Sequence, residues 1–191
     1  MIILVIGLIF LCIIIVLVTL SIKYYNNFVV LKNRVLDQQA QIDVQLKRRC
    51  DLIPNLIQTV KGSANFEKST LEAVTNARTK ALHAANLNDV IQTNNELSGA
   101  LRNFFAVSEN YPDLKSNASF LQLQSEFSTT EDKIAKSRQF FNDTVMKYNT
   151  ALELFPANIF AKIFGYQPFA YLTAEESEKQ SIKMDDNTFQ F

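Results

Sequence analysis

The sequence predicts an all-α protein in which an N-terminal transmembrane helix continues into an elongated antiparallel bundle of about four long helices. Residues 2–22 form an uncharged apolar run, apolar residues after it recur at spacings of three and four, and the hairpin dipeptides Asn-Gly and Asp-Gly do not occur. We therefore expect a transmembrane anchor at 1–23, a helical bundle domain at 24–172 and a polar C-terminal tail at 173–191.

The apolar run at residues 2–22 has the length and composition of a membrane-spanning helix. About 20 apolar residues cross a hydrocarbon core of roughly 30 Å, and a helix satisfies its own backbone groups there. A cleaved signal peptide would need a basic start and a cleavage site with small residues. No Lys or Arg precedes the run, and Lys23-Tyr24-Tyr25 lacks such a site. We expect an uncleaved anchor.

Basic residues after the run predict its orientation. Lys23, Lys32 and Arg34 fall within the window that the positive-inside rule counts. The rule predicts a single-pass protein with its N-terminus outside and its bundle in the cytoplasm. Cys12 lies in the apolar run, which leaves Cys50 as an unpaired thiol that suits a reducing compartment.

The first three bundle helices follow from breakers and apolar spacing. No Gly or Pro lies between Leu8 and Ile53, so the anchor can continue as one rod to about Lys61, with Pro54 kinking it or starting a new turn. Further helices are expected at about 64–85 and 89–110, with a turn at 86–88 and a bridge at 113–117.

A seven-residue repeat marks the fourth and longest helix. An apolar residue at every seventh position over about 36 residues is typical of a packing seam, and the helix would be roughly 55 Å long. A short amphipathic segment at 157–164 follows, with Gly165 as its C-cap, and the tail is expected to be mobile. The repeat consists of Phe120, Phe127, Ile134, Phe141, Tyr148 and Phe155.

Composition argues against several classes of function. The 19 basic and 19 acidic residues balance, whereas a nucleic-acid binder shows a basic excess. One histidine leaves no Cys/His cluster for a metal, and four glycines leave little room for phosphate-binding loops. No nucleophile stands at the spacing that catalysis needs. We expect no catalytic site, no metal and no cofactor.

A polar layer interrupts the apolar spacing of the first helix. Gln38, Gln45 and Arg49 stand at seam positions, where polar groups need partners. On the long helix, Glu131 and Arg138 lie near the seam. The layer is either a binding or proton-handling site, or an ion-pair layer that fixes helix register or a subunit contact; the second is favoured. Its candidate residues are Gln38, Asp43, Gln45, Arg48, Arg49, Asp51, Glu131 and Arg138.

Aromatic residues crowd the end of the predicted bundle domain. They form either ordinary core that closes one end of the bundle, which is favoured, or an exposed patch for oligomerisation or membrane contact. These candidates are Phe155, Phe160, Phe164, Tyr166, Phe169 and Tyr171.

Several motifs together closely resemble the LemA family. The resemblance covers residues 24–170. It rests on Tyr25-Asn26, the segments at 41–49, 51–56, 60–62, 71–74 and 111–115, Ala77-Arg78, Thr130-Glu131, Ile134-Ala135, Arg138, Phe141-Asn142, Tyr148-Asn149, Phe155-Pro156 and Phe164-Gly165.

The resemblance implies a bacterial membrane protein with one span and a cytoplasmic domain of long antiparallel helices. It implies no reaction, because no enzymatic activity is established for the family. Some relatives are linked to membrane remodelling around organelles, and others are encoded near membrane proteases or stress factors. Cys50 stands where histidine is common, and Ser63 and Phe66 replace a frequent Tyr and His. Any metal or proton role of those histidines would be missing here.

The leading expectation is a non-enzymatic, membrane-anchored scaffold or adaptor that self-associates at the bacterial inner membrane, in membrane organisation or stress. Its expected partners are the lipid bilayer and further copies of the chain, with no nucleic acid. The alternative is an adaptor that presents substrates to a membrane protease or regulates it. An enzyme is the least favoured interpretation.

Overall fold

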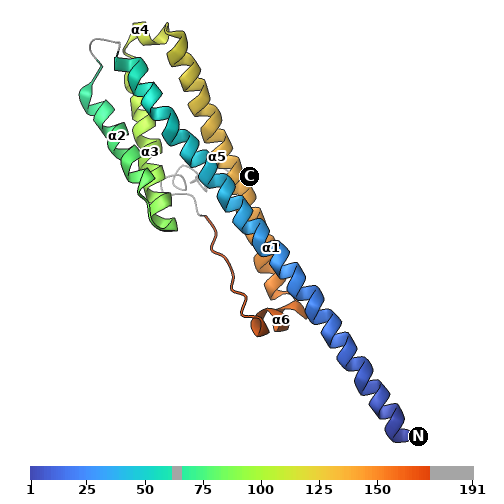
Figure 1. The fold of residues 1–191 in the computed structure, drawn as a ribbon. Helices are drawn as coiled ribbons and strands as arrows, with labels where there is room; N and C mark the ends of the chain where they lie inside the picture. The colour runs from blue at the N-terminus through green and yellow to red at the C-terminus, as the bar shows by residue number, and fades with distance from the viewer. Residues whose placement is uncertain (62–65, 173–191) are drawn as a thin grey trace, which may run out of the picture. The chain divides into compact units, whose positions relative to one another are not determined.

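The structure is a computed structural model that describes residues 1–61 and 66–172, apart from the side chains of Leu87 and Asn88. The described residues form helices and no strand, which confirms the all-α prediction (Figure 1). The predicted tail at 173–191 lies outside them. The helices are α1 (Ile2–Lys61), α2 (Lys68–Leu82), α3 (Leu87–Ser108), α4 (Pro112–Lys115), α5 (Ala118–Glu153) and α6 (Ala157–Ile163).

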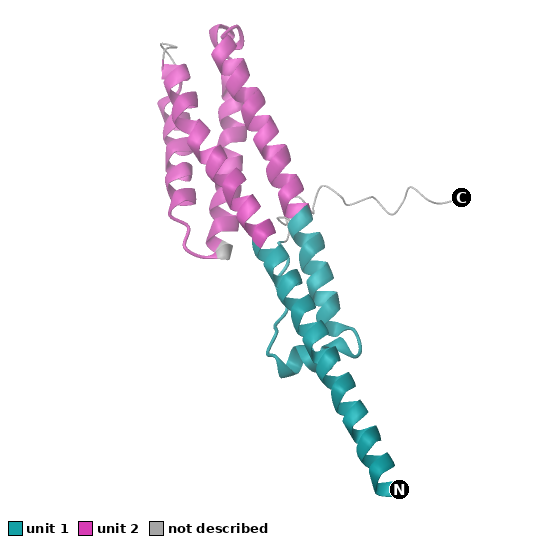
Figure 2. Ribbon diagram, turned by 45° about the vertical axis from the view of Figure 1, so that its right-hand side comes forward, with its two compact units in different colours: residues 1–36, 140–191 teal, residues 37–139 magenta. Residues whose placement is uncertain are grey.

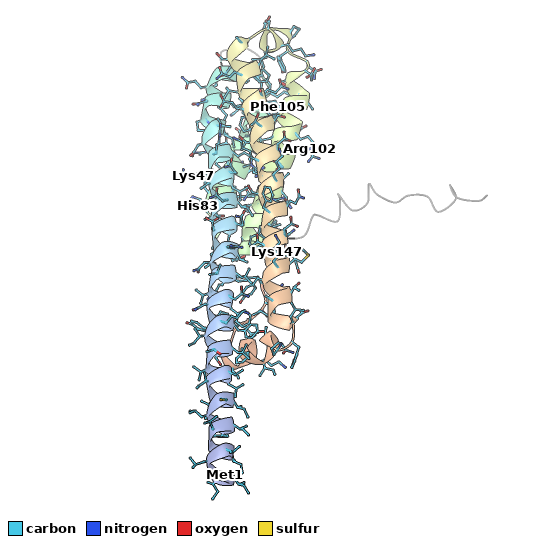
Figure 3. The ribbon with its side chains drawn as sticks, turned by 90° about the vertical axis from the view of Figure 1, so that its right-hand side faces the viewer. Met1, Lys47, His83, Arg102, Phe105 and Lys147 are labelled. Carbon is cyan, nitrogen blue, oxygen red and sulfur yellow. The ribbon has the colours of Figure 1, made fainter. Side chains whose placement is uncertain are left out.

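Helix α1 is the predicted continuous rod. It is 60 residues long and contains Pro54. Its first turns carry apolar side chains on all sides (Figure 3). Among the described residues it is the single helix long and apolar enough to cross a membrane. The predicted domain boundary at residue 23 falls inside this helix and stays a prediction.

The shorter helices differ in detail from those predicted. Helix α2 ends three residues early, at Leu82. Helix α3 begins at Leu87 because the side chain of Asn86 caps it, accepting a bond of 2.9 Å from the Asp89 amide. Pro112 starts α4 where a plain bridge was expected, since proline is favoured at the first helical position.

The chain divides into two compact units, which Figure 2 shows in different colours. Unit 2 comprises residues 37–139. In it, the later part of α1 packs with α2, α3, α4 and the first part of α5. Its apolar core follows the spacing of three and four on each helix. The core includes Ile53, Leu56, Val60, Val74, Leu97, Leu101, Phe104, Phe120 and Phe127.

Unit 1 comprises residues 1–36 and 140–191, of which the structure describes those up to 172. In it, the first part of α1 packs with the last part of α5, with α6 and with the segment that follows α6. Phe28 and Val35 of α1 are fully buried, as are Val145 and Tyr148 of α5. The predicted seam holds from Phe120 to Tyr148, each position being buried.

The prediction was wrong for the last position of that seam. Phe155 is 81% exposed. Helix α5 ends at Glu153, so the seven-residue spacing no longer sets the direction of this side chain. The end of α6 was predicted correctly. Gly165 has a φ of 71°, and the Gly165 and Tyr166 amides donate back to Lys162 and Ala161, which is a Schellman motif.

Candidate functional site

A buried arginine forms the centre of the polar layer in unit 2. Arg49 on α1 is 1% exposed. Its Nη1 donates to Glu131 Oε1 on α5 and to Ser98 Oγ on α3, both at 2.6 Å. Its Nη2 donates to the backbone oxygen and to Oδ1 of Asn94 on α3, at 3.1 and 2.7 Å. One guanidinium group therefore joins three helices.

The charges of this layer are unequally buried. Arg49 has no access to water, whereas the side chain of Glu131 is 42% exposed. A buried charge needs both a countercharge and hydrogen bonds to offset its lost hydration. Glu131 supplies the charge, and Asn94 and Ser98 supply neutral acceptors. The arrangement is suited to holding α1, α3 and α5 in one register.

One donor and one acceptor in this layer are unsatisfied among the described residues. Arg49 Nε and Gln45 Oε1 are buried and have no hydrogen-bond partner among the described residues. The two residues are four apart on α1, so their side chains lie on one face of the helix. An unpaired buried polar group costs about 1–3 kcal/mol. This is the least satisfied part of the layer.

The other predicted members of the layer do not join Arg49. Gln38 and Arg138 are half-buried, and Asp43, Arg48 and Asp51 are exposed. Asp51 instead pairs with Lys47 one turn earlier, at 3.0 Å. Of the eight candidates, the structure thus brings Arg49 and Glu131 together. A role of this layer beyond a structural one stays a prediction.

The sequence interpretation missed Asn94 and Ser98. A signal for Asn94 was present, because Leu97, Leu101 and Phe104 mark the buried face of α3. One step back in the same spacing leads to Asn94, which is 3% exposed. A polar residue at such a position needs a partner on a neighbouring helix.

A second polar contact in unit 2 replaces a backbone hydrogen bond that is missing from α1. In an α-helix, each carbonyl accepts a bond from the amide four residues later, and proline has no amide hydrogen. Pro54 therefore cannot serve the carbonyl of Cys50. The Nε of Arg78 on α2 donates to that oxygen at 2.9 Å. Proline and arginine together thus tie α2 to one position of α1.

Cys50 itself has the properties of an inert core thiol. It is free and buried. Burial raises the pKa of the thiol, and the nearby Arg49 and Arg78 offset this only in part. The thiolate is the reactive form of cysteine, so a raised pKa keeps the group unreactive at neutral pH. Among the described residues, no three His, Cys, Asp or Glu side chains are grouped to hold a metal ion.

The predicted aromatic patch separates into an inner and an outer part. Phe160 is buried and stacks on Tyr24 of α1, with ring centres 5.2 Å apart. Tyr166 packs on Phe28 at 5.2 Å. Phe164 contacts Tyr25, and Phe169 contacts Tyr148, each at 5.2 Å. Phe155, Tyr171 and Phe164 are exposed, at 81%, 48% and 37%.

Two asparagines of α5 hold the segment after α6, and the sequence interpretation did not assign this role. The side chain of Asn149 donates to the Phe169 carbonyl at 2.9 Å and accepts from the Phe169 amide at 3.0 Å. Asn142 makes the same two bonds to Leu172, at 2.8 and 2.9 Å. Two turns apart on one helix face, the two amides fix the extended segment along α5.

Comparison with known proteins identifies a matching family and several relatives. The LemA family model matches residues 38–185. Protein LemA of Metamycoplasma hominis is 27% identical over 79% of this chain and 69% of its own length. Magnetosome protein MamQ of Magnetospirillum gryphiswaldense is 22% identical over 81% of this chain and 66% of its own. Magnetosome protein MamQ 2 of Paramagnetospirillum magneticum is 23% identical over 77% and 64%.

The chain thus spans about two thirds of the length of these relatives. None of the three is named for an enzymatic activity. The family model covers the later part of α1 and every helix after it. The chain belongs to the LemA family.

Proposed function

We propose that the chain is a non-enzymatic scaffold that is anchored in the bacterial inner membrane and self-associates there, in membrane organisation or stress. The observation that carries the proposal is the continuity of α1. The same unbroken helix supplies the exposed apolar run and the buried core residues Phe28 and Val35 of unit 1. Such a helix connects the proposed membrane-spanning segment directly to the packed domain.

The apolar run supports the membrane part of the proposal. Its large side chains, such as Leu4 at 79% and Phe10 at 65%, are exposed over residues 2–18 and at Ile22. An apolar surface of this size is costly in water and favourable in lipid. Lys23, Lys32 and Arg34 favour a cytoplasmic bundle, because basic residues stay on the inner side.

The state of the polar groups supports a structural role. Arg49 donates four hydrogen bonds to neighbouring helices, and Cys50 is a buried thiol with a raised pKa. The relatives' names also favour a non-enzymatic role. Two of them are named for the magnetosome, which favours a part in cellular organisation.

Exposed apolar residues outside the span are available for contacts between copies. Unit 1 exposes Val30 at 49% on α1 and Met146 at 50% on α5. Unit 2 exposes Val44 at 58% on α1 and Leu121 at 48% on α5. A second copy that packs against these positions would remove apolar surface from water.

The test is the size of the full-length protein extracted with its lipids into polymer-bounded discs. Light scattering or mass photometry over a range of concentrations should find more than one copy in each particle. A monomer under every condition contradicts self-association. A stable complex with a membrane protease, identified in the same particles, would favour the alternative adaptor function.

The adaptor alternative has one observation in its favour. The two asparagines of α5 hold the chain in an extended form up to Leu172, which is immediately followed by the polar tail. A photo-crosslinker at Phe191 tests this alternative in cells. Capture of a membrane protease or of its substrates supports it, and capture of further copies of the chain supports the scaffold.

A further inference from the structure

Helix α6 carries large apolar residues on its outer side, beside the exposed Lys162, as well as on its inner side. Its inner residues Ala157, Phe160 and Ala161 are buried. On the outside, Ile159 and Ile163 are 49% and 69% exposed, and they lie one turn apart on one face. A short surface helix in water normally has polar residues there.

Two more exposed apolar residues directly precede α6 in the chain. Leu154 and Phe155, between α5 and α6, are 59% and 81% exposed. We call Leu154, Phe155, Ile159 and Ile163 the outer face of α6. The exposure of four neighbouring large apolar residues needs an explanation other than chance, because single exposed apolar residues are the common case.

Ring contacts place α6 close to the end of the apolar run. Phe160 stacks on Tyr24, and Phe164 contacts Tyr25, with ring centres 5.2 Å apart in both pairs. The two tyrosines come two and three residues after Ile22, which is about 3–5 Å along the helix axis. The headgroup layer on each side of a bilayer is about 5–7 Å thick. When the run spans a bilayer, α6 therefore lies in that layer.

The position of α6 on α1 is fixed from its C-terminal side as well. The Schellman motif directs the chain so that Tyr166 packs on Phe28, with ring centres 5.2 Å apart. Three residues later, Asn149 holds Phe169 by two hydrogen bonds. All of these contacts lie within unit 1, so α6 stays at the level of the two tyrosines.

The charge of this part of the chain suits a bacterial membrane surface. Residues 154–172 contain no acidic residue, and their one charged side chain is the exposed Lys162. Helices that lie in the headgroup layer combine exposed apolar residues with lysine or arginine, whose amine reaches the anionic headgroups. Tyrosine is also enriched at this depth of a membrane.

We propose that the outer face of α6 is a second membrane contact, which lies in the headgroup layer of the bilayer that α1 spans. Its ligand is a lipid surface with anionic headgroups. This inference rests on the membrane anchoring proposed above. The contact would fix how deep the chain sits and how α1 is turned about its own axis.

The absence of tryptophan in the chain allows a direct test. Single tryptophans replace Phe155 or Ile163 in the full-length protein, which is reconstituted into phosphatidylethanolamine and phosphatidylglycerol vesicles with or without lipids brominated on their acyl chains. Phe140→Trp is the matched control. Phe140 is also exposed, at 58%, but lies on α5 about 20 Å before its end. Phe10→Trp reports on the span.

We expect brominated lipid to reduce the emission of Phe155→Trp, Ile163→Trp and Phe10→Trp but not that of Phe140→Trp. If Phe10→Trp is quenched while the two α6 variants behave like Phe140→Trp, the anchoring stands and the second contact is wrong. Emission at α6 that is blue-shifted but insensitive to bromine shows a second copy of the chain as the occupant. If Phe10→Trp is not quenched, the proposed anchoring fails and this inference fails with it.

Discussion

Arg49 brings a full positive charge into the core of unit 2, and its charged partner lies closer to water than it does. The Arg49 side chain is 1% exposed and that of Glu131 is 42% exposed. Removal of Arg49 and removal of Glu131 should therefore lower the free energy of unfolding by different amounts. Without Arg49, the carboxylate can be hydrated; without Glu131, the guanidinium stays buried with neutral acceptors alone.

This asymmetry gives a prediction about stability. Glu131→Leu should lower the free energy of unfolding by about 3–5 kcal/mol, because it leaves an uncompensated buried charge. The double variant Arg49→Met with Glu131→Leu should be more stable than Glu131→Leu alone, since no charge then remains in the core. Urea unfolding in detergent, followed by far-UV circular dichroism, measures both changes.

The matched control is Asp132→Leu on the same helix. Asp132 is exposed, so its replacement should change stability by no more than about 0.5 kcal/mol. A double variant that is no more stable than Glu131→Leu would contradict the account of Arg49 as a buried, paired charge. It would favour the other interpretation of the layer, in which its polar residues bind a ligand.

The residues of this site differ in how well the sequence predicts them. Arg49 was predictable, because it stands in a series of seam positions that includes Ile42 and Leu56. Ser98 was not predictable, because the sequence alone does not distinguish an exposed serine from a buried one. Its partner, Arg49, comes from a different helix, α1. Gln38 stands at the same kind of position as Arg49, but its side chain is half-buried and its amide donates to the neighbouring Asp37 at 3.4 Å.

At the scale of the helix, Pro54 shows how α1 continues through a residue that usually breaks helices. The loss of one backbone bond is compensated by Arg78, which donates to the orphaned carbonyl of Cys50. The arginine comes from α2. The proline thus leaves the Cys50 carbonyl of α1 as an acceptor for a side chain, and this carbonyl specifies where α2 attaches.

A double-mutant cycle tests this pairing. Arg78→Ala should cost about 1–3 kcal/mol, because it leaves the Cys50 carbonyl without a donor. With Pro54→Ala, the new amide at position 54 can serve that carbonyl, so Arg78→Ala should then cost less. We expect a coupling energy of about 0.5–3 kcal/mol between the two sites. Thermal or urea unfolding of the four proteins measures it.

Arg102 provides the control for this cycle. It is an exposed arginine on α3 of the same unit (Figure 3). Arg102→Ala should have the same small effect with proline or alanine at position 54. Equal costs of Arg78→Ala in both backgrounds would show that the arginine contributes to packing and not to the missing backbone bond.

Helix bounds were predictable where one residue decides them. Gly165 ends α6 as predicted, because a left-handed turn there favours glycine. Phe155 was predicted as part of the seam from its spacing alone, and spacing carries no information once α5 has ended at Glu153. The role of Asn142 and Asn149 depends on the path of the chain after α6, which no local pattern specifies.

At the scale of the whole molecule, the all-α class followed from periodicity and from the absence of Gly and Pro between Leu8 and Ile53. The division into two compact units did not. Helices α1 and α5 contribute to both units, and their apolar spacing continues across residues 36–37 and 139–140 without a change in pattern. The sequence therefore predicts the seams but not where one cluster of contacts ends.

The last prediction concerns what the anchor adds to assembly. A bilayer confines tethered copies to one surface and raises their effective concentration, so weak contacts between exposed positions such as Val44 and Met146 can suffice for assembly. Removal of residues 1–22 keeps the buried core residues Phe28 and Val35 but removes the tether. We expect this fragment to stay helical and to self-associate about 10²–10⁴-fold more weakly than the anchored protein.

A chain in which an unrelated apolar helix replaces residues 2–22 separates tethering from specific contacts of the span. If the tether alone matters, this chimera assembles like the natural protein. If it remains monomeric in the membrane, the side chains of the span take part in the contact between copies. Analytical ultracentrifugation of the fragment, compared with mass photometry of the two anchored proteins, gives the three sizes. A fragment that forms the same oligomer as the anchored protein would show that the anchor only locates the assembly, because the bundle contacts would then be strong enough without it.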